Sequence, residues 1–224
     1  MDGAVAGLVL LAVLVILAII IVSRSVALIP QAEAAVIERL GRYSRTVSGQ
    51  LTLLVPFIDR IRARVRRTPV LTNAALDAAC GGRLFFKCEN LQEVGAFKAR
   101  GATNAVFSLT DAEAARGVAT HSSGNHAAAL ARAARLRGIP AYIVMPSNSP
   151  KSKVRNVESF GGQITFCEPT QQAREDTCAA IVARTGATMI HPFTDERVMA
   201  GQGSAVLELL EEAPDLDVVL CPVG

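Results

Sequence analysis

The sequence predicts an α/β domain with a parallel sheet, preceded by an apolar helix that spans a membrane. Two observations lead to this prediction. From residue 68 onward, short strand-like segments alternate with longer helix-like segments, which is the pattern of parallel strands joined by crossover helices. Residues 3–22 contain no charged side chain, and about twenty apolar residues are enough to cross a hydrocarbon core.

The elements of the α/β part follow from apolar periodicity and from the residues that end each segment. Thr72 is the expected N-cap of the first helix, and Gly81 with Gly82 turns the chain after it. Gly201 and Gly203 are interpreted as a turn before the last helix. We expect helices at residues 73–79, 97–109, 125–137, 151–160, 171–185 and 205–212, and strands at residues 83–88, 117–120, 141–145, 163–167 and 218–223.

The N-terminal segment is interpreted as one membrane-spanning helix over residues 1–23. A cleaved signal peptide is the rival interpretation, but the segment starts with Asp2, has no leading Lys or Arg, and exceeds a typical signal core in length. The positive-inside rule places the C-terminal side in the cytoplasm, because four arginines follow the helix: Arg24, Arg39, Arg42 and Arg45. We therefore expect a single-pass membrane protein that contacts lipid through this helix, with its C-terminal domain in the cytoplasm.

Lys98 stands out as a candidate reactive group. It follows Phe97 at the start of an expected helix, where an apolar stretch begins. Burial lowers the pKa of a lysine and allows it to form a Schiff base, which an arginine cannot do because its guanidinium keeps its proton. An ordinary exposed helix lysine is the alternative interpretation.

A second polar stretch, T-H-S-S-G-N-H at residues 120–126, follows an expected strand and precedes an alanine-rich helix. Ligands in parallel sheets lie beyond the C-terminal ends of strands. Free N–H groups and the helix dipole at such a helix start favour an anion. A plain N-cap is the alternative, but it explains only one Ser or Asn of this stretch.

These stretches carry a family resemblance. The sequence from about residue 67 to 224 resembles the serine racemase and threonine dehydratase group of fold-type II pyridoxal-phosphate (PLP) enzymes. The motifs that carry it are F-K-A-R-G-A at 97–102, T-H-S-S-G-N-H at 120–126, Y-I-V-M-P at 142–146, C-E-P-T at 167–170, A-R-E at 173–175 and M-A-G-Q-G-S at 199–204. The resemblance implies the N-terminal part of a tryptophan synthase β-like domain, with a small domain at about 108–195.

The resemblance also implies the chemistry. Lys98 matches the lysine that binds pyridoxal 5'-phosphate covalently and then acts as the base on one face of the substrate. Ser123 matches the residue that exchanges the proton on the opposite face in serine racemases. Phe97 matches a side chain that stacks on the cofactor ring, and Asn125 one that contacts the ring hydroxyl. The expected substrate is L-serine or L-threonine, with serine or threonine dehydratase (ammonia-lyase) and serine racemase as the two activities.

The substrate carboxylate has its own implied site. The loop residues that match it in the resemblance are Ser122, Gly124, Asn125 and His126. Arg174 matches an arginine that pairs with this carboxylate in racemases, since a guanidinium suits a bidentate contact. An exposed helix arginine is an equally good interpretation of Arg174.

The last residues depart from the family pattern. In the family, the strand at 218–223 continues into a run of glycines that cradles the cofactor phosphate, and only Gly224 is present here. We therefore expect the catalytic half of the site without its phosphate anchor. An incomplete sheet would also expose an unpaired edge, which leaves homo-oligomer formation open.

Residues 24–66 resemble a different family. Together with the apolar helix, they are similar to the start of the membrane scaffold proteins of the stomatin and prohibitin type, a likeness that ends near residue 65. Two alternatives to an enzyme therefore remain open, a membrane-anchored stomatin-like scaffold fragment and an inactive chimeric remnant.

Other functional classes are disfavoured. A net charge of +3 without an interleaved aromatic and basic surface gives no reason to expect a nucleic-acid partner. The three histidines, His121, His126 and His191, lack metal-ligand spacing, so no metal site is expected.

Overall fold

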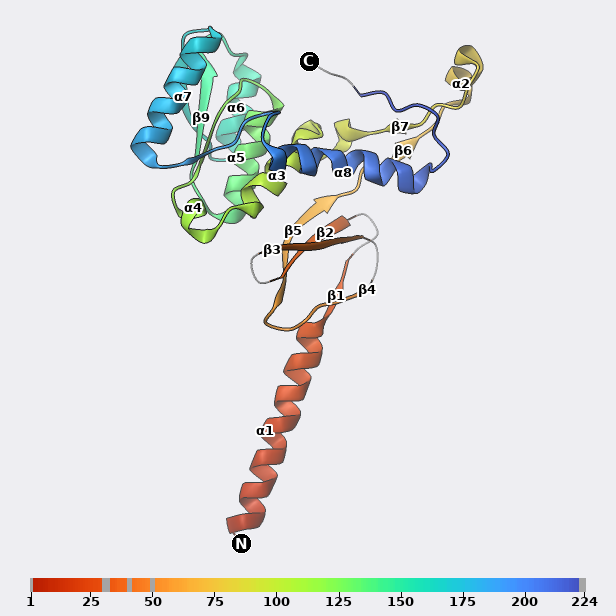
Figure 1. Ribbon diagram of the computed structural model, residues 1–224, viewed down its shortest axis with the longest axis vertical. Helices are drawn as coiled ribbons and strands as arrows, with labels where there is room; N and C mark the ends of the chain where they lie inside the picture. The colour runs from red at the N-terminus through yellow and green to blue at the C-terminus, as the bar shows by residue number, and fades with distance from the viewer. Residues whose placement is uncertain (1, 30–32, 40–41, 49–50, 222–224) are drawn as a thin grey trace. The chain divides into compact units, whose positions relative to one another are not determined.

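The computed structural model describes residues 2–29, 33–39, 42–48 and 51–221 (Figure 1). The chain divides into two compact units, Met1–Val65 and Arg66–Gly224. The first unit holds the apolar helix and two small sheets. The second unit holds a parallel sheet with helices on both of its faces.

The first unit starts with α1 (Asp2–Ser25), which confirms a long N-terminal helix. Its side chains at residues 7–24 are all exposed. The segment Gly7–Ser25 is long and apolar enough to cross a membrane, a test that a signal sequence also passes.

Five strands complete the first unit. They are β1 (Val26–Leu28), β2 (Glu33–Arg39), β3 (Arg42–Ser48), β4 (Leu51–Leu53) and β5 (Asp59–Arg66). β1 pairs antiparallel with β4, and the second sheet has the order β3-β2-β5. Arg39 and Asp59 join β2 to β5 through a bidentate ion pair with distances of 2.7 and 2.9 Å.

The second unit is built on a parallel sheet of order β10-β9-β8-β11, which confirms the predicted fold class. Its strands are β8 (Val118–His121), β9 (Ala141–Pro146), β10 (Gln163–Cys167) and β11 (Thr188–Met189). The first three agree with the predicted strands to within a residue. β11 was not predicted, because two residues are too few to show a periodic pattern.

Helices cover both faces of this sheet, as the alternation of side chains along its strands shows. Val118, Ile143 and Met145 join the core beneath α5 (Asn125–Arg137). Their neighbours Ala119 and Val144 pack instead with Cys178 and Ile181 of α7. The other helices in this part of the second unit are α3 (Lys98–Ser108), α4 (Asp111–Ala115), α6 (Lys151–Ser159) and α7 (Gln171–Thr185).

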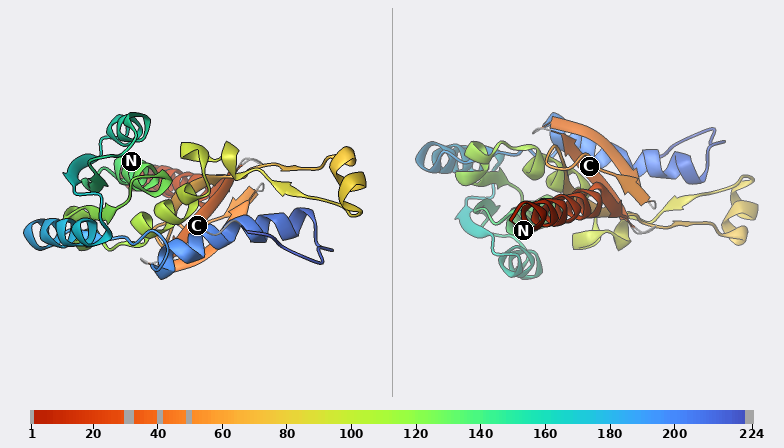
Figure 2. Two further views of the ribbon diagram at one scale, coloured as in Figure 1. Left: turned by 90° about the horizontal axis from the view of Figure 1, so that it is seen from above. Right: turned by 90° about the horizontal axis from the view of Figure 1, so that it is seen from below.

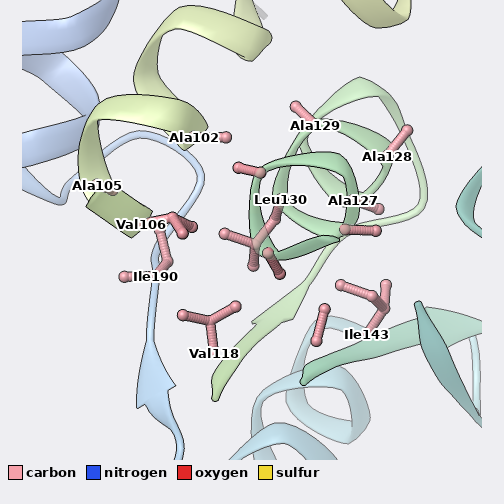
Figure 3. Close-up of a cluster of buried hydrophobic side chains, with 14 of the residues drawn as sticks. Ala102, Ala105, Val106, Val118, Ala127, Ala128, Ala129, Leu130, Ile143 and Ile190 are labelled. Carbon is pink, nitrogen blue, oxygen red and sulfur yellow. The ribbon is translucent and has the colours of Figure 1, made fainter. Parts of the chain in front are cut away.

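The larger core lies between α3, α5 and the sheet (Figure 3). Leu130 of α5 is fully buried there beside Val106 of α3 and Ile190, which follows β11. The many alanines on α5 leave room for α3 to pack closely on it. Truncating a fully buried leucine such as Leu130 to alanine typically costs about 2–5 kcal/mol. This core therefore fixes the position of the N-terminal ends of α3 and α5.

The last helix, α8 (Glu196–Glu212), begins nine residues before its predicted start at residue 205. The predicted turn at Gly201 and Gly203 is wrong, since both lie inside the helix. The glycine at 201 is a packing requirement: a Cβ atom there would lie 2.7 Å from Arg100 O and from Gly101 Cα on α3. α8 crosses α3 too closely to allow a side chain at this position.

The segment before α3 forms an arm from β6 (Val70–Leu71), α2 (Ala74–Cys80) and β7 (Phe86–Lys87), which Figure 2 shows extending away from the parallel sheet. Asn73 caps α2, and not Thr72 as predicted: its Oδ1 accepts from the N–H groups of Ala75 and Leu76. Gly81 ends the helix in the left-handed conformation, as expected. The predicted strand at 83–88 is shorter in the structure, where only Phe86 and Lys87 are in a strand.

A buried ionic cluster joins this arm to α8. Arg100, only 1% exposed, donates to both carboxylate oxygens of Glu89 and of Glu208 at 2.7–2.9 Å. Lys87 Nζ lies 3.1 Å from Glu208 as well. Burial by itself lowers the pKa of Arg100, but the two carboxylates outweigh it and the net change is upward.

The predicted strand at 218–223 is not found. Its described part, residues 218–221, forms no strand, and Val218 and Leu220 are exposed. No strand of the described chain pairs with residues 218–221. The remaining short helices precede α3 and are η1 (Glu89–Leu91) and η2 (Glu93–Gly95).

Candidate functional site

Lys98 is presented by a tight turn. Val94 and Gly95 both have left-handed backbone conformations, with φ of 58° and 72°. A positive φ is rare for a β-branched residue, and such strain clusters at functional sites. Val94 packs against the main core, which offsets the strain. The turn leads directly into Phe97 and places Lys98 at the first position of α3.

The Lys98 side chain is half-buried. Its Nζ donates to Pro192 O at 2.9 Å and lies 5.0 Å from the centre of the Phe97 ring. Burial lowers the pKa of this lysine. Of the two interpretations of Lys98, the partly buried lysine is the one that the structure shows, and its lowered pKa favours the uncharged amine more than in a free lysine.

The 122–126 loop follows β8 at the C-terminal end of the sheet, as predicted. Ser122 is held by its N–H, which donates to Val144 O at 3.0 Å, and its Oγ accepts from Gly124 N–H at 3.3 Å. Gly124 is the N-cap of α5 and provides no side chain to cap it. The first N–H groups of α5 are therefore available to an anion. Ser123 lies half-buried in the middle of this loop.

His126 links the loop to the segment beside Lys98. Its Nε2 lies 3.2 Å from Ile190 O, two residues before the carbonyl that binds Lys98. A carbonyl only accepts, so Nε2 carries the proton and Nδ1 is an acceptor. Nδ1 is buried without a hydrogen-bond partner in the described structure. Burial is the main cause that lowers the pKa of His126 to about 4, and the Lys98 charge adds to it.

The Nε2 contact limits the predicted role of His126. The side chain is only 2% exposed, and one ring nitrogen is committed to the backbone. Its N–H group in the first turn of α5 is the part of His126 that is placed to receive a carboxylate.

Asn125 has a partner that was not predicted from the sequence. Its Oδ1 accepts from Lys153 Nζ, on α6, at 3.0 Å. The two residues are 28 positions apart and belong to different helices. Nothing in the local sequence around Lys153 indicates this contact.

Two further histidine contacts border the loop. The His121 and His191 rings meet edge to face, with centres 5.4 Å apart, and His191 packs in the same way on Phe193. Burial and then the charge of His191 lower the pKa of His121. Among the residues that the structure describes, no group of three or more His, Cys, Asp or Glu side chains could hold a metal ion.

Arg174 lies apart from the other predicted residues. It is in the first turn of α7, and its Nε donates back to Thr170 O at 3.3 Å. Its link to the site is electrostatic, because its charge is one of the smaller causes that lower the pKa of His121. The structure thus brings together Lys98 and the 122–126 loop, and places Arg174 near His121 without a direct contact to Lys98.

The residues at this site suit pyridoxal phosphate at its reactive end. They provide a half-buried amine of lowered pKa, an adjacent aromatic ring, an uncapped helix N-terminus and an asparagine amide. Gly224, the residue that the resemblance links to the phosphate, lies outside the described part of the chain.

The fold is that of part of a fold-type II PLP enzyme. The chain belongs to the pyridoxal-phosphate dependent enzyme family, whose sequence model matches residues 61–224. It is 55% identical over 166 residues to a β-hydroxyaspartate dehydratase of Paracoccus denitrificans, covering 74% of this chain and 53% of the relative. It is 52% identical over 166 residues to a serine racemase of Arabidopsis thaliana, covering 74% and 50%.

A solved structure agrees with these sequence comparisons. Maize serine racemase superimposes with a TM-score of 0.67 and 51% identity, over 68% of this chain and 46% of that protein. The chain therefore spans about half the length of the relatives that it matches.

Proposed function

We propose that this chain carries the lysine-bearing half of a PLP-dependent enzyme that acts on a small hydroxy amino acid, as a dehydratase (ammonia-lyase) or a racemase. The observation that carries the proposal is Lys98, a half-buried amine of lowered pKa that is close enough to the uncapped start of α5 for its charge to lower the pKa of His126. When bound, the cofactor supplies an electron sink for the bond that breaks at the substrate α-carbon.

The proposed roles follow from the chemistry of each side chain. Lys98 takes the α-proton on one face of the substrate, since its burial favours the uncharged amine. Ser123 exchanges a proton on the other face, which a racemase needs and a dehydratase does not. Phe97 and Asn125 hold the cofactor ring.

The substrate carboxylate is proposed to bind at the start of α5. The His126 N–H group in the first turn of α5 and the helix dipole favour a negative charge there. The N–H groups of Ser122 and Gly124 already donate to Val144 O and to Ser122 Oγ, so a carboxylate that binds them has to replace these two hydrogen bonds. Arg174 reaches this carboxylate only if its side chain leaves Thr170 O, which a flexible arginine on the first turn of α7 can do.

The names of the relatives indicate the substrate class. A serine racemase and a β-hydroxyaspartate dehydratase act on amino acids with a β-hydroxyl group, as L-serine and L-threonine also have. We propose L-serine or L-threonine as the substrate, and β-hydroxyaspartate as a third candidate.

Product analysis separates the two activities. The full chain in detergent, with added pyridoxal phosphate and L-serine, yields pyruvate and ammonia if it is a dehydratase and D-serine if it is a racemase. Lys98→Ala is expected to abolish both, whereas Ser123→Ala abolishes racemisation and retains elimination. Product formation equal in the wild type and in Lys98→Ala would refute the enzyme proposal for this chain.

We also propose that α1 anchors the protein in a membrane. Residues 7–22 are apolar on all sides of the helix and exposed. A helix that is apolar on all sides belongs in a protein core or a bilayer. The arginines that follow favour a cytoplasmic C-terminal domain. The stomatin-like scaffold interpretation of residues 24–66 stays a prediction.

The intact mass of the protein purified from membranes tests the anchor. A retained anchor gives the mass of the whole chain, and the protein resists extraction at alkaline pH. A mass that lacks the first helix shows instead that the segment is a cleaved signal sequence.

A further inference from the structure

We propose that Lys153 is a positioning residue that orients the side-chain amide of Asn125, so that the Asn125 Nδ2 group donates to an anionic oxygen at the N-terminus of α5. The choice of ligand rests on the proposed function, whereas the pairing of the two side chains does not.

The chemistry of the pair fixes the orientation of the amide. A lysine ammonium has three donors and no acceptor. Only the Oδ1 atom of Asn125 can therefore face Lys153 Nζ, which lies 3.0 Å away. The Nδ2 group, with two donors, must then be directed away from Lys153. Asn125 is thereby set to donate, and its ligand must be an acceptor.

The electrostatics of the site favour an anionic acceptor. A cation beside a helix N-terminus opposes the helix dipole, so a lysine there does not stabilise α5. Across the described part of the chain, no carboxylate forms a salt bridge with Lys153, and the same is true of Lys98. Both lysines are half-buried. The Lys153 ammonium, which has no carboxylate partner in the described chain, adds positive charge beside an uncapped helix, and an anion there would neutralise it.

Lys98 and Lys153 act on two adjacent residues at the start of α5. The Lys98 charge is close enough to lower the pKa of His126, and Lys153 binds Asn125, the residue directly before it. Two anionic oxygens in the proposed reaction could accept from Nδ2. One is the ring hydroxyl oxygen of the cofactor, and the other belongs to the α-carboxylate of the amino acid. Both are anionic oxygens, so the same orientation of the amide serves either one.

The test follows the Asn125 side-chain amide by NMR in the full chain in detergent, labelled with ¹⁵N-asparagine. The Asn125→Asp variant identifies its signals. Pyridoxal phosphate and L-serine are added separately and then together. We expect the Asn125 signals to shift with at least one of them. Lys153→Met keeps the apolar stem and removes the donor. This variant is expected to change the Asn125 signals and to weaken the binding of the ligand that shifts them by about 10-fold or more.

Two further variants separate positioning from general structure. Lys153→Arg retains a donor-only cation and is expected to restore most of the binding. Lys151→Met is the matched control, because Lys151 is exposed two residues earlier on α6, and it is expected to change neither the signals nor the affinity. Circular dichroism of each variant checks that the fold is retained.

The outcomes distinguish the sources and the two proposals. A shift with pyridoxal phosphate alone identifies the cofactor oxygen, and a shift that needs L-serine identifies the carboxylate. If wild-type protein forms no product but Lys153→Met still weakens the ligand-induced shift, the proposed activity fails and the positioning role stands. Asn125 signals that are insensitive to Lys153→Met, or that respond to neither ligand, would overturn the inference even in an active enzyme.

Discussion

Acidification from pH 7 to pH 5 should destabilise the second unit, and His126 should cause most of the loss. This side chain is 2% exposed and its pKa is lowered from 6.5 to about 4, first by burial and then by Lys98 and His191, against the opposing effects of Ile190 O and Asp195. In the unfolded chain the imidazole takes up a proton near pH 6.5, whereas in the folded chain it stays neutral until about pH 4. The unfolded state therefore binds more protons in this window, and the free energy of unfolding falls as the pH falls.

The magnitude follows from the two pKa values. At about 1.4 kcal/mol per pKa unit, the difference between 6.5 and about 4 limits the loss to about 3 kcal/mol. About 2 kcal/mol of this is lost by pH 5. The carboxylates of Glu208 and Asp195 have pKa values lowered from 4.5 and 3.8, so their stabilisation is lost only at more acidic pH.

Urea unfolding of the full chain in detergent, followed by circular dichroism at several pH values, measures this loss. His126→Gln keeps a donor for Ile190 O and removes the titration, so it should flatten most of the pH dependence. Some slope should remain because the pKa of His121 is also lowered. An unchanged slope in His126→Gln, or greater stability at pH 5 than at pH 7, would refute the reasoning.

Two other predictions concern α8. Gly201→Ala should destabilise the second unit by about 1–3 kcal/mol, because its Cβ would meet the backbone of α3 at 2.7 Å; Gly203→Ala, where nothing lies within 4 Å, should instead stabilise it by up to about 1 kcal/mol. Glu208→Gln should cost about 3 kcal/mol, since it leaves the buried charge of Arg100 with one carboxylate partner, whereas Glu211→Gln, on an exposed carboxylate, should leave the urea midpoint unchanged. Equal effects within either pair of variants, measured by urea unfolding, would contradict these packing and charge arguments.

Local patterns predicted much of the fold. The helices at 125–137 and 171–185 and the strand at 163–167 were predicted with the bounds that the structure shows, because their apolar periodicity and their capping residues agree. The start of α8 was missed because Gly201 and Gly203 were interpreted as a turn. Such glycines can equally serve a close helix crossing, and only the position of α3 decides between the two.

The candidate site was predictable to a similar extent. The position of the 122–126 loop follows from small polar residues after a strand. The sequence left the burial of Lys98 open, because an apolar stretch that starts at a lysine also fits an exposed helix lysine. The contacts that hold these groups were not predictable. Lys98 meets Pro192, 94 positions away, and Asn125 meets Lys153, 28 positions away. Both contacts depend on how helices and strands pack, which a local pattern does not encode.

The central claim is that Lys98 binds pyridoxal phosphate in this chain. The most direct measurement is the visible absorbance of the detergent-purified protein with added pyridoxal phosphate, compared with Lys98→Ala and with the exposed-lysine control Lys151→Ala. We predict a visible band in the wild type and in Lys151→Ala that is absent from Lys98→Ala. No band, or a band of equal strength in Lys98→Ala, would contradict the claim.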